Sequence, residues 1–447
     1  MKEWVQNLLQ LMSGVLGVFV IQELFSYILN HIFDKAEKSV PSILKIIRDK
    51  QIEKFYSIRE SDEYKRFEYE YLRTYYGEDF FTELFSKEKI PVYTIQYDYE
   101  QDKGKKIDTI RYYDKLGNRE GVEFSFDLSD HQGYKKNKYY LKYKWLVGKN
   151  IKASDRPGFM LDKLICNERG MIQFRAFVGT YAENVYSNHV LEYELYKLYR
   201  LYWKKKRPME QLCQDSHIRN AMHVSALCGE KCAEQMKKSL ESGEGRQSLL
   251  GVQMLVLIRK ADDYTISIIE RSKSVAVAPG RFQLVPSGGF EIFNESQTKY
   301  STFEIEDNYS AGCAVFREYL EEIFGVGECE GTGTGSVKEM LNKDTRIREL
   351  EEMLSNGKAE FRFLGSVMDL AGLRHELSFV LVIHDEQYQE NQFKGNEEGK
   401  SRKIISDVYL SDFENRKDIW KNLHGPSAAM WMLFKNSGLY EKLKNNM

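Results

Sequence analysis

Two stretches of the sequence carry its strongest pattern: Gly288-Gly289-Phe290-Glu291-Ile292-Phe293-Asn294-Glu295 and Arg317-Glu318-Tyr319-Leu320-Glu321-Glu322-Ile323-Phe324-Gly325-Val326. In an α-helix, Glu318 and Glu322 lie one turn apart with Glu321 beside them. Carboxylates this close repel one another, and a divalent cation relieves that repulsion. Mg²⁺ prefers carboxylate oxygens together with water and phosphate oxygens, so an acidic helix opposite a glycine turn indicates a metal-pyrophosphate site.

These residues resemble the signature of the Nudix hydrolase superfamily, which reads Gly, five residues, Glu, seven residues, Arg-Glu-apolar-x-Glu-Glu-x-Gly-apolar. Gly289 and Glu295 match the first spacing, and Arg317 to Glu322 match the core of the second. The chain departs from the pattern in having 21 residues between Glu295 and Arg317, and two residues rather than one between Glu322 and Gly325. We interpret the first departure as a 14-residue insertion in the loop before the helix, where extra length costs little free energy.

The resemblance implies a Nudix α/β/α sandwich for residues 245–447. Strand-like apolar runs lie on both sides of the signature, and a helix is predicted near the C-terminus. The strand-like runs are 252–259, 265–270, 282–286, 361–368 and 377–384, and the helix is 426–442. The order of these segments is the order that the sandwich requires.

The same resemblance implies a Mg²⁺- or Mn²⁺-dependent hydrolase that cleaves the pyrophosphate bond of a nucleoside diphosphate linked to another group. It assigns metal binding to Glu318, Glu321 and Glu322, and the catalytic base to Glu321, Glu322 or a residue of a later loop. Among the later residues Asp369, His375 and Glu376, we favour Glu376. The residues that support the site structurally are Gly288, Gly289, Glu295, Arg317 and Gly325, and Glu304 or Glu306 could take the role of Glu295.

A second hypothesis uses the same domain differently. A catalytically weak Nudix domain could bind a nucleotide as a sensor and pass the response to an N-terminal membrane or interaction module. Fold does not separate the two hypotheses, because function depends on the site.

Length and composition predict an α+β, multidomain protein. A chain of 447 residues exceeds what a single core usually supports. We divide it into an N-terminal hydrophobic helix at 1–40, an α+β module at 41–244 and the Nudix domain at 245–447.

Basic residues (65) nearly balance acidic ones (67), which disfavours nucleic acid as a partner. Six scattered cysteines do not form a disulfide framework, and this favours a reducing, cytoplasmic location.

Residues 8–29 form the one strongly apolar block, interrupted by Gln22 and Glu23. The block is about long enough to cross a bilayer, but a carboxylate within a span costs roughly 2.5–3.5 kcal/mol. Two readings stay open: one N-terminal helix that anchors a cytoplasmic protein to the membrane, or a buried or oligomerising helix.

The middle region carries alternating strand and helix patterns without an identifying motif. Predicted strands are 92–99, 109–113, 122–126, 139–146 and 171–178, with a turn at 115–118, and predicted helices lie at 52–84 and 190–203. The tyrosines of 190–203 have helical spacing and indicate core packing. Irregular spacing argues against a zinc site at Cys213, His217, His223, Cys228 and Cys232. The lysines and aromatics of 134–145, and the basic run 204–207, favour a solvated face over nucleic-acid binding.

Overall fold

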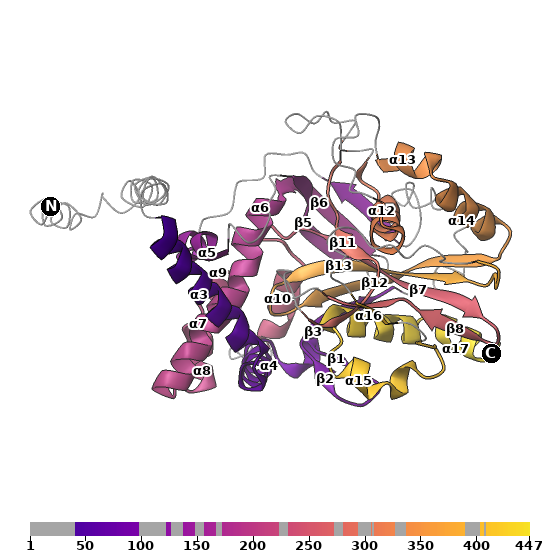
Figure 1. Cartoon of the computed structure of the whole chain (residues 1–447). Helices are drawn as coiled ribbons and strands as arrows, with labels where there is room; N and C mark the ends of the chain where they lie inside the picture. Colours follow the sequence, from indigo (N-terminus) through magenta and orange to yellow (C-terminus); the bar gives the residue numbers. More distant parts are fainter. Residues whose placement is uncertain are drawn as a thin grey trace, which may run out of the picture.

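The structure is a computed structural model that describes residues 41–97, 122–126, 137–147, 156–166, 172–222, 231–271, 280–293, 305, 308–326, 337–388, 403–405 and 408–447. It is an α+β, multidomain structure, as the composition predicted. Figure 1 shows a mainly helical N-terminal half beside a sheet that carries helices on both faces. Within the described part of the chain, no helix combines the length and apolar character that a membrane crossing requires. Residues 8–29 lie outside that part.

Six strands form the largest sheet. Its order is β11-β7-β13-β12-β3, with β8 also paired to β7. Strands β7 and β13 are parallel, and the other pairs are antiparallel. The strands are β3 (Val92–Gln96), β7 (Gly251–Lys260), β8 (Asp263–Ile266), β11 (Ser287–Gly289), β12 (Ala359–Asp369) and β13 (Arg374–Ile383). The predicted strands at 252–259, 361–368 and 377–384 are confirmed by β7, β12 and β13.

The two faces of this sheet bury different cores, because successive side chains of a strand point to opposite sides. In β7, Val252 and Met254 pack with helix α12, whereas Leu255 and Leu257 pack with helix α16. Figure 1 shows α12 and α14 on one side of the sheet, and α16 and α17 on the other. The helices are α12 (Ala311–Phe324), α13 (Val337–Lys343), α14 (Thr345–Ser355), α15 (Lys417–Trp420), α16 (Gly425–Asn436) and α17 (Leu439–Lys444).

The helix predicted at 426–442 is present as two helices, α16 and α17. Gly438 separates them with a positive φ of 73°, a conformation that glycine adopts without steric cost. Three smaller sheets surround the large one, with orders β1-β2, β10-β9-β14 and β4-β6-β5. Their strands are β1 (Thr82–Glu83), β2 (Lys89–Ile90), β4 (Val122–Phe126), β5 (Pro157–Cys166), β6 (Ile172–Thr180), β9 (Ile268–Glu270), β10 (Phe282–Leu284) and β14 (Lys403–Ile405).

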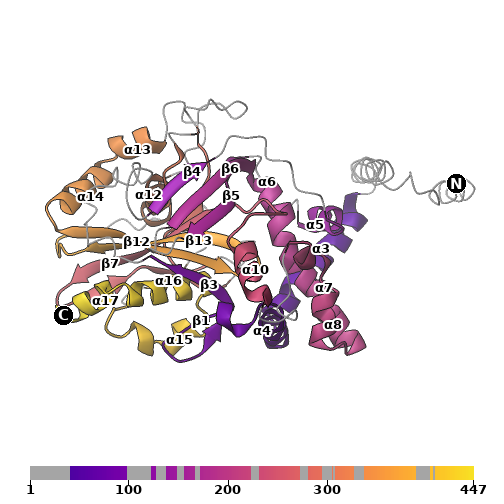
Figure 2. The same cartoon turned by 180° about the vertical axis from the view of Figure 1, so that it is seen from behind.

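The helical N-terminal half packs around a tyrosine-rich core, seen from behind in Figure 2. Tyr193 and Tyr196 of α7 are buried in it, as their helical spacing predicted. The helices are α3 (Pro41–Glu60), α4 (Asp62–Tyr76), α5 (Tyr140–Val147), α6 (Tyr181–Asn184), α7 (Val190–Lys205), α8 (Met209–Gln214), α9 (His217–Met222) and α10 (Lys231–Leu240), with short helical turns at Glu78–Phe80, Val185–His189 and Phe413–Asn415. The prediction of a strand at 139–146 is wrong, since this segment is α5. Tyr140, Tyr143 and Leu146 are buried at three-residue spacing, which suits one face of a helix.

Strand β3 joins the two halves of the chain. It comes from the segment 41–244 and pairs with β12 of the large sheet, from Gln96 opposite Gly365 to Val92 opposite Asp369. Gln96 also donates a hydrogen bond to the Leu433 carbonyl of α16 across 3.2 Å. The predicted strand at 109–113 and the predicted turn at 115–118 lie outside the described residues.

Candidate active site

Helix α12 carries the predicted acidic residues. It begins after Ser310, whose hydroxyl accepts a hydrogen bond from the Cys313 backbone N–H across 3.1 Å. It ends at Gly325, which has a φ of 65° and so adopts the left-handed conformation typical of a helix C-terminus. Every residue of α12 is buried, the glutamates included. Buried carboxylates require compensating charge or hydrogen bonds.

Arg317 supplies part of that compensation. Its guanidinium contacts Glu321 across 2.9 Å and Glu318 across 2.5 Å, and it donates to the Gly289 carbonyl across 3.1 Å. The guanidinium also lies 4.2 Å from the centre of the Phe293 ring. Arg317 therefore pairs with two carboxylates of its own helix and holds α12 against β11.

Glu318 and Glu322 face strand β11 from successive turns of α12. The backbone N–H of Ser287 donates to Glu322 Oε2 across 2.8 Å. A methyl group on Gly288 would lie 1.9–2.4 Å from the carboxylate atoms of Glu318. The carboxylate of Glu318 therefore occupies the space that any other residue at 288 would fill. Glu321, like Glu318, contacts Arg317.

The charge of this cluster is unbalanced. Burial raises the pKa of Glu318 to about 8, and the nearby Glu321, Glu322 and Glu291 add to the rise, while Arg317 opposes it. Glu291 is already paired with Arg156 across 2.9 Å. Helix α12 therefore buries three carboxylates and one arginine, and the site favours a further positive charge.

The donor atoms of these residues, which are carboxylate oxygens, suit a hard divalent cation. Carboxylate oxygens are what Mg²⁺ and Mn²⁺ prefer, and the excess negative charge favours a cation here. Glu318 and Glu322 are the two placed side by side against β11. No group of three or more His, Cys, Asp or Glu side chains is arranged for a metal ion among the described residues. A bound ion would therefore draw its remaining ligands from water, backbone carbonyls or the substrate.

Glu376, the favoured later-loop residue, lies away from the acidic residues of α12. Its neighbours Leu377 and Phe379 pack in the α12 core, whereas Val380 and Val382 pack in the α16 core. Alternation therefore directs Glu376 to the α16 face, opposite the acidic helix. It is paired in register with Gly251, and burial raises its pKa to about 7, opposed by Arg374 and Arg271. The structure does not bring Glu376 together with Glu318 and Glu322.

The other later-loop residues have structural partners. Asp369 accepts hydrogen bonds from the backbone N–H groups of Ala371 and Gly372, which closes the β12–β13 turn. His375 contacts the Ser366 hydroxyl and the Leu240 carbonyl, both across 3.0 Å. Glu295, Glu304 and Glu306 lie outside the described residues.

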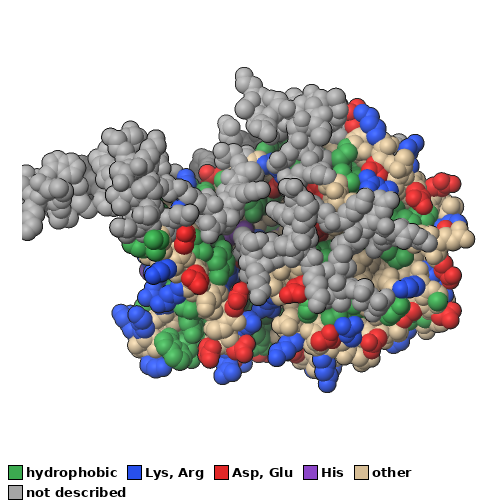
Figure 3. Space-filling view, in the orientation of Figure 1, with side chains coloured by type: hydrophobic (Ala, Val, Ile, Leu, Met, Phe, Trp, Pro, Cys, Tyr) green, Lys and Arg blue, Asp and Glu red, His purple; other side chains and the backbone are tan. Residues whose placement is uncertain are grey.

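The residues that the sequence analysis considered as zinc ligands do not form a cluster in the described part of the chain. Cys213 is buried in α8, and His217 at the start of α9 is exposed. His223 and Cys228 lie outside the described residues, as does the side chain of Cys232. On the face shown in Figure 3, acidic and basic side chains are interspersed rather than separated into fields of one sign.

A series of side-chain hydrogen bonds that the sequence did not reveal connects Ser287 of β11 to Arg271. The Ser287 hydroxyl accepts from the Gln283 amide, and the Gln283 carbonyl oxygen accepts from Arg271. Ser287 thus contacts Glu322 through its backbone and Arg271 through Gln283. One sequence signal for these contacts was available. Gln283 stands between apolar residues of a strand, and a buried polar residue there requires hydrogen-bond partners.

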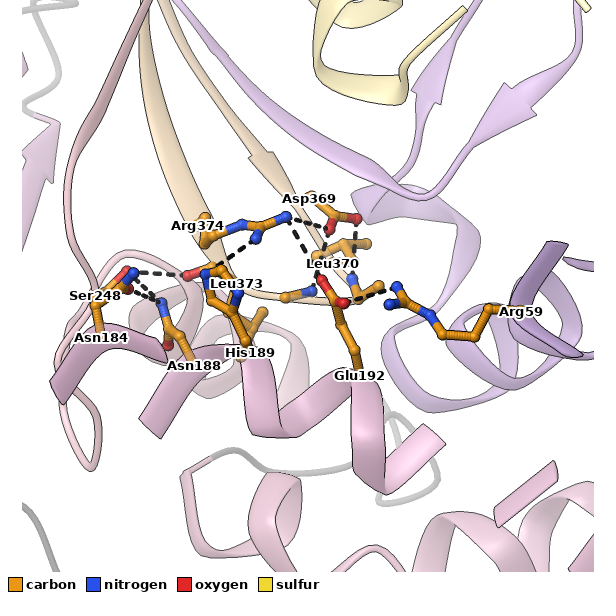
Figure 4. A network of polar contacts seen from close by, with 12 residues as sticks. Arg59, Asn184, Asn188, His189, Glu192, Ser248, Asp369, Leu370, Leu373 and Arg374 are labelled. Carbon is orange, nitrogen blue, oxygen red and sulfur yellow. Dashed lines mark hydrogen bonds and ion pairs between the residues drawn. The ribbon is translucent and has the colours of Figure 1, made fainter. Parts of the chain in front are cut away.

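A second network connects the helical half to the large sheet (Figure 4). Glu192 of α7 contacts Arg59 of α3 across 2.7 Å and Arg374 of β13 across 3.6 Å. Arg374 also contacts Asp369 across 3.7 Å and His189 across 3.2 Å. Burial and the charge of Arg374 lower the pKa of His189 to about 3, so its ring is neutral.

The comparisons with known proteins add no assignment to this geometry. No protein-family model matches the chain, and no curated protein matches its sequence.

Proposed function

We propose that this protein is a Mg²⁺-dependent hydrolase of the Nudix type, acting on the pyrophosphate bond of a nucleoside diphosphate linked to another group. The observation that carries the proposal is the pair Glu318 and Glu322, buried one helical turn apart against a strand without side chains at Gly288 and Gly289. Arg317 neutralises only part of the local charge. This combination suits a cation and a phosphate group approaching β11.

In this proposal Glu318 and Glu322 would hold the ion, which when bound supplies positive charge to the phosphoryl oxygens and to the attacking water. Glu322, oriented by the Ser287 N–H, accepts the proton of that water. Glu321 keeps Arg317 in place and so acts as a positioning residue. Gly288 and Gly289 let the backbone of β11 approach a substrate closely. A cation held by Glu318 would replace the proton that this carboxyl group keeps near neutral pH.

The test is a substrate panel with the full chain: ADP-ribose, NAD, dinucleoside polyphosphates and nucleoside triphosphates, each with Mg²⁺, with Mn²⁺ and with EDTA. We expect metal-dependent release of a nucleoside monophosphate or of phosphate. The variants Glu318→Gln and Glu322→Gln should each lower turnover at least 100-fold, of the order of one lost general-base or metal contribution. Glu349→Gln, at an exposed position of α14, is the matched control and should leave turnover unchanged. Turnover that persists in both site variants would refute the proposal.

The network around Glu192 favours a second candidate function, a nucleotide sensor. It connects α3 and α7 to β13 by buried ion pairs, through which a ligand at the sheet would influence the helical half. Nucleotide binding by the unmodified protein without any turnover, across the same panel, would favour the sensor over the hydrolase.

A further inference from the structure

Four large hydrophobic side chains are exposed in the described part of the chain, and all four belong to the helical half. They are Ile46 and Ile47 of α3 and Tyr202 and Trp203 of α7, and Trp203 is 57% exposed. Exposed hydrophobic side chains that are scattered singly need no explanation, but adjacent ones rimmed by polar residues mark interaction surfaces. The two pairs are therefore candidates for such a surface.

The start of α3 and the end of α7 lie at the same end of the molecule. The two helices cross where the Phe55 ring of α3 contacts the Tyr196 ring of α7, with 5.1 Å between the ring centres. From this crossing, both helix ends extend away from the large sheet, to the left in Figure 1 and to the right in Figure 2. Both exposed pairs are therefore carried on the end of the molecule that is remote from the sheet.

The contacts at the end of α7 hold Trp203 in its exposed position. The helix ends at Lys206, which has a left-handed φ of 51° and whose backbone N–H donates to the Tyr202 carbonyl across 3.0 Å. Tyr202 packs against Phe67 of α4, with 5.3 Å between the ring centres. Tyr199 stacks 6.5 Å from the Trp203 ring, and the Lys206 ammonium lies 4.8 Å from the centre of that ring. The ring is thus positioned by its neighbours although most of its surface is exposed.

This end of α7 is also strongly basic. Residues 195–207 contain six basic residues and no acidic one. Arg207 is paired with Asp215, whereas Lys204, Lys205 and Lys206 are exposed and form no ion pair with a described residue. The surface therefore combines exposed aromatic rings with positive charge that the described residues do not neutralise.

The sequence before α3 indicates which partner suits this surface. The apolar block 8–29 is followed by eleven residues, 30–40, and then by α3 at Pro41. Eleven residues span at most about 40 Å. A bilayer that took up the block would therefore lie close to the end of the molecule that carries Ile46 and Ile47.

We propose that the start of α3 and the end of α7 form a binding surface for an anionic membrane. Tryptophan and tyrosine are enriched at the membrane–water interface because their rings are apolar with one polar group. Lysines are attracted to anionic lipid headgroups, and Ile46 and Ile47 add apolar contact with the acyl chains. Nucleic acid fits less well, because a base that stacked on Trp203 would compete with Lys206 for the ring. Membrane binding here does not require any chemistry at α12.

The first test is sedimentation of the full chain with phosphatidylcholine vesicles that contain either no phosphatidylserine or about 30% of it. We expect tighter binding to the anionic vesicles. The triple variant Lys204→Gln/Lys205→Gln/Lys206→Gln should bind them at least about tenfold more weakly, since each cation near such a surface contributes about fivefold to the affinity.

A second triple variant, Lys417→Gln/Lys421→Gln/Lys444→Gln, is the matched control. It removes three exposed lysines from α15, from the residue after α15 and from α17, on the side of the molecule away from α7. Its affinity for anionic vesicles should equal that of the parent protein. Thermal melting of each variant checks that the fold is kept.

The second test reports on Trp203 itself. Brominated lipids quench the fluorescence of a tryptophan that enters the bilayer, so the quenching lost in Trp203→Phe is the share that this residue contributes. We expect less quenching by brominated anionic vesicles in Trp203→Phe than in the parent protein. The position of the other tryptophans does not affect the difference, because both proteins contain them.

Several results would overturn the proposal. They are equal affinity of the two triple variants for anionic vesicles, equal quenching in Trp203→Phe and the parent protein, or no binding of the parent protein to anionic vesicles. In the last case, binding of single-stranded RNA that the variant at 204–206 weakens would assign the surface to nucleic acid. Self-association that is lost in Trp203→Gln would instead assign it to a second copy of the chain.

Discussion

The backbone N–H of Ser287 donates a hydrogen bond to Glu322 Oε2 across 2.8 Å, and so fixes which side of α12 faces β11. One turn earlier, Glu318 fills the space beside the hydrogen atoms of Gly288. These two contacts hold two carboxylates at the same strand.

Gly288→Ala should displace Glu318. The added methyl group would lie 1.9–2.4 Å from its carboxylate atoms, and the flexible end of a glutamate can move away. We therefore expect a loss of stability within about 1–3 kcal/mol, as for other overpacked sites, together with much weaker Mg²⁺ binding. Calorimetric titration with Mg²⁺ measures the second effect. Gly372→Ala is the control, because its methyl group would make only ordinary 3.4 Å contacts. Equal Mg²⁺ affinity in the two variants would contradict the prediction.

Arg317→Met should destabilise the protein by about 3–5 kcal/mol, because it leaves Glu318 and Glu321 buried without their shared positive charge. Urea unfolding measures this. The double variant Arg317→Met/Glu321→Met should recover part of the loss, since it removes one of the two stranded carboxylates. Added Mg²⁺ should stabilise Arg317→Met more than the double variant. A double variant as unstable as the single one would argue against this pairing.

Glu376 should make the stability fall as the pH rises. Its folded-state pKa of about 7 lies above the ordinary value of 4.5. Between these values the folded chain keeps a proton that the unfolded chain has lost, so stability decreases through this pH window and is level above it. Glu376→Gln should lack that decline. Relative to the parent protein, it should gain about 1–3 kcal/mol between pH 5 and pH 8. Unfolding curves at both pH values measure the difference, and parallel curves would exclude the shift. Glu68 titrates in the same range but contributes equally to both proteins.

Glu192→Gln should separate the helical half from the sheet energetically. Removing this carboxylate, which is 4% exposed, takes away the shared partner of Arg59 and Arg374, and breaking a buried pair in this way costs about 3–5 kcal/mol. Glu234→Gln breaks an exposed pair with Lys238 and should have no measurable effect on stability. Hydrogen exchange should show faster opening of α3 and α7 in Glu192→Gln alone. Unchanged exchange would show that the network does not hold these elements.

Much of the large sheet could be predicted because its strands are long and apolar. Strands β7, β12 and β13 are buried on both faces, and near-continuous apolar runs are typical of such strands. The error at α5 arose because aromatic residues suit both strands and helices in a short segment. There, contacts of Tyr143 with α7 rather than local preference select the helix.

The sequence by itself determined that Arg317, Glu318, Glu321 and Glu322 share a helix, since their spacing matches one turn and Gly325 ends it. Only the tertiary structure decided their contacts: Glu318 and Glu321 share Arg317, while Glu318 and Glu322 lie against β11. It also placed Glu376 on the opposite face of the sheet. The physical reason is that spacing along a chain fixes neighbours within one helix or strand. Contacts between residues far apart in sequence depend instead on strand register and on which face of the sheet each helix covers.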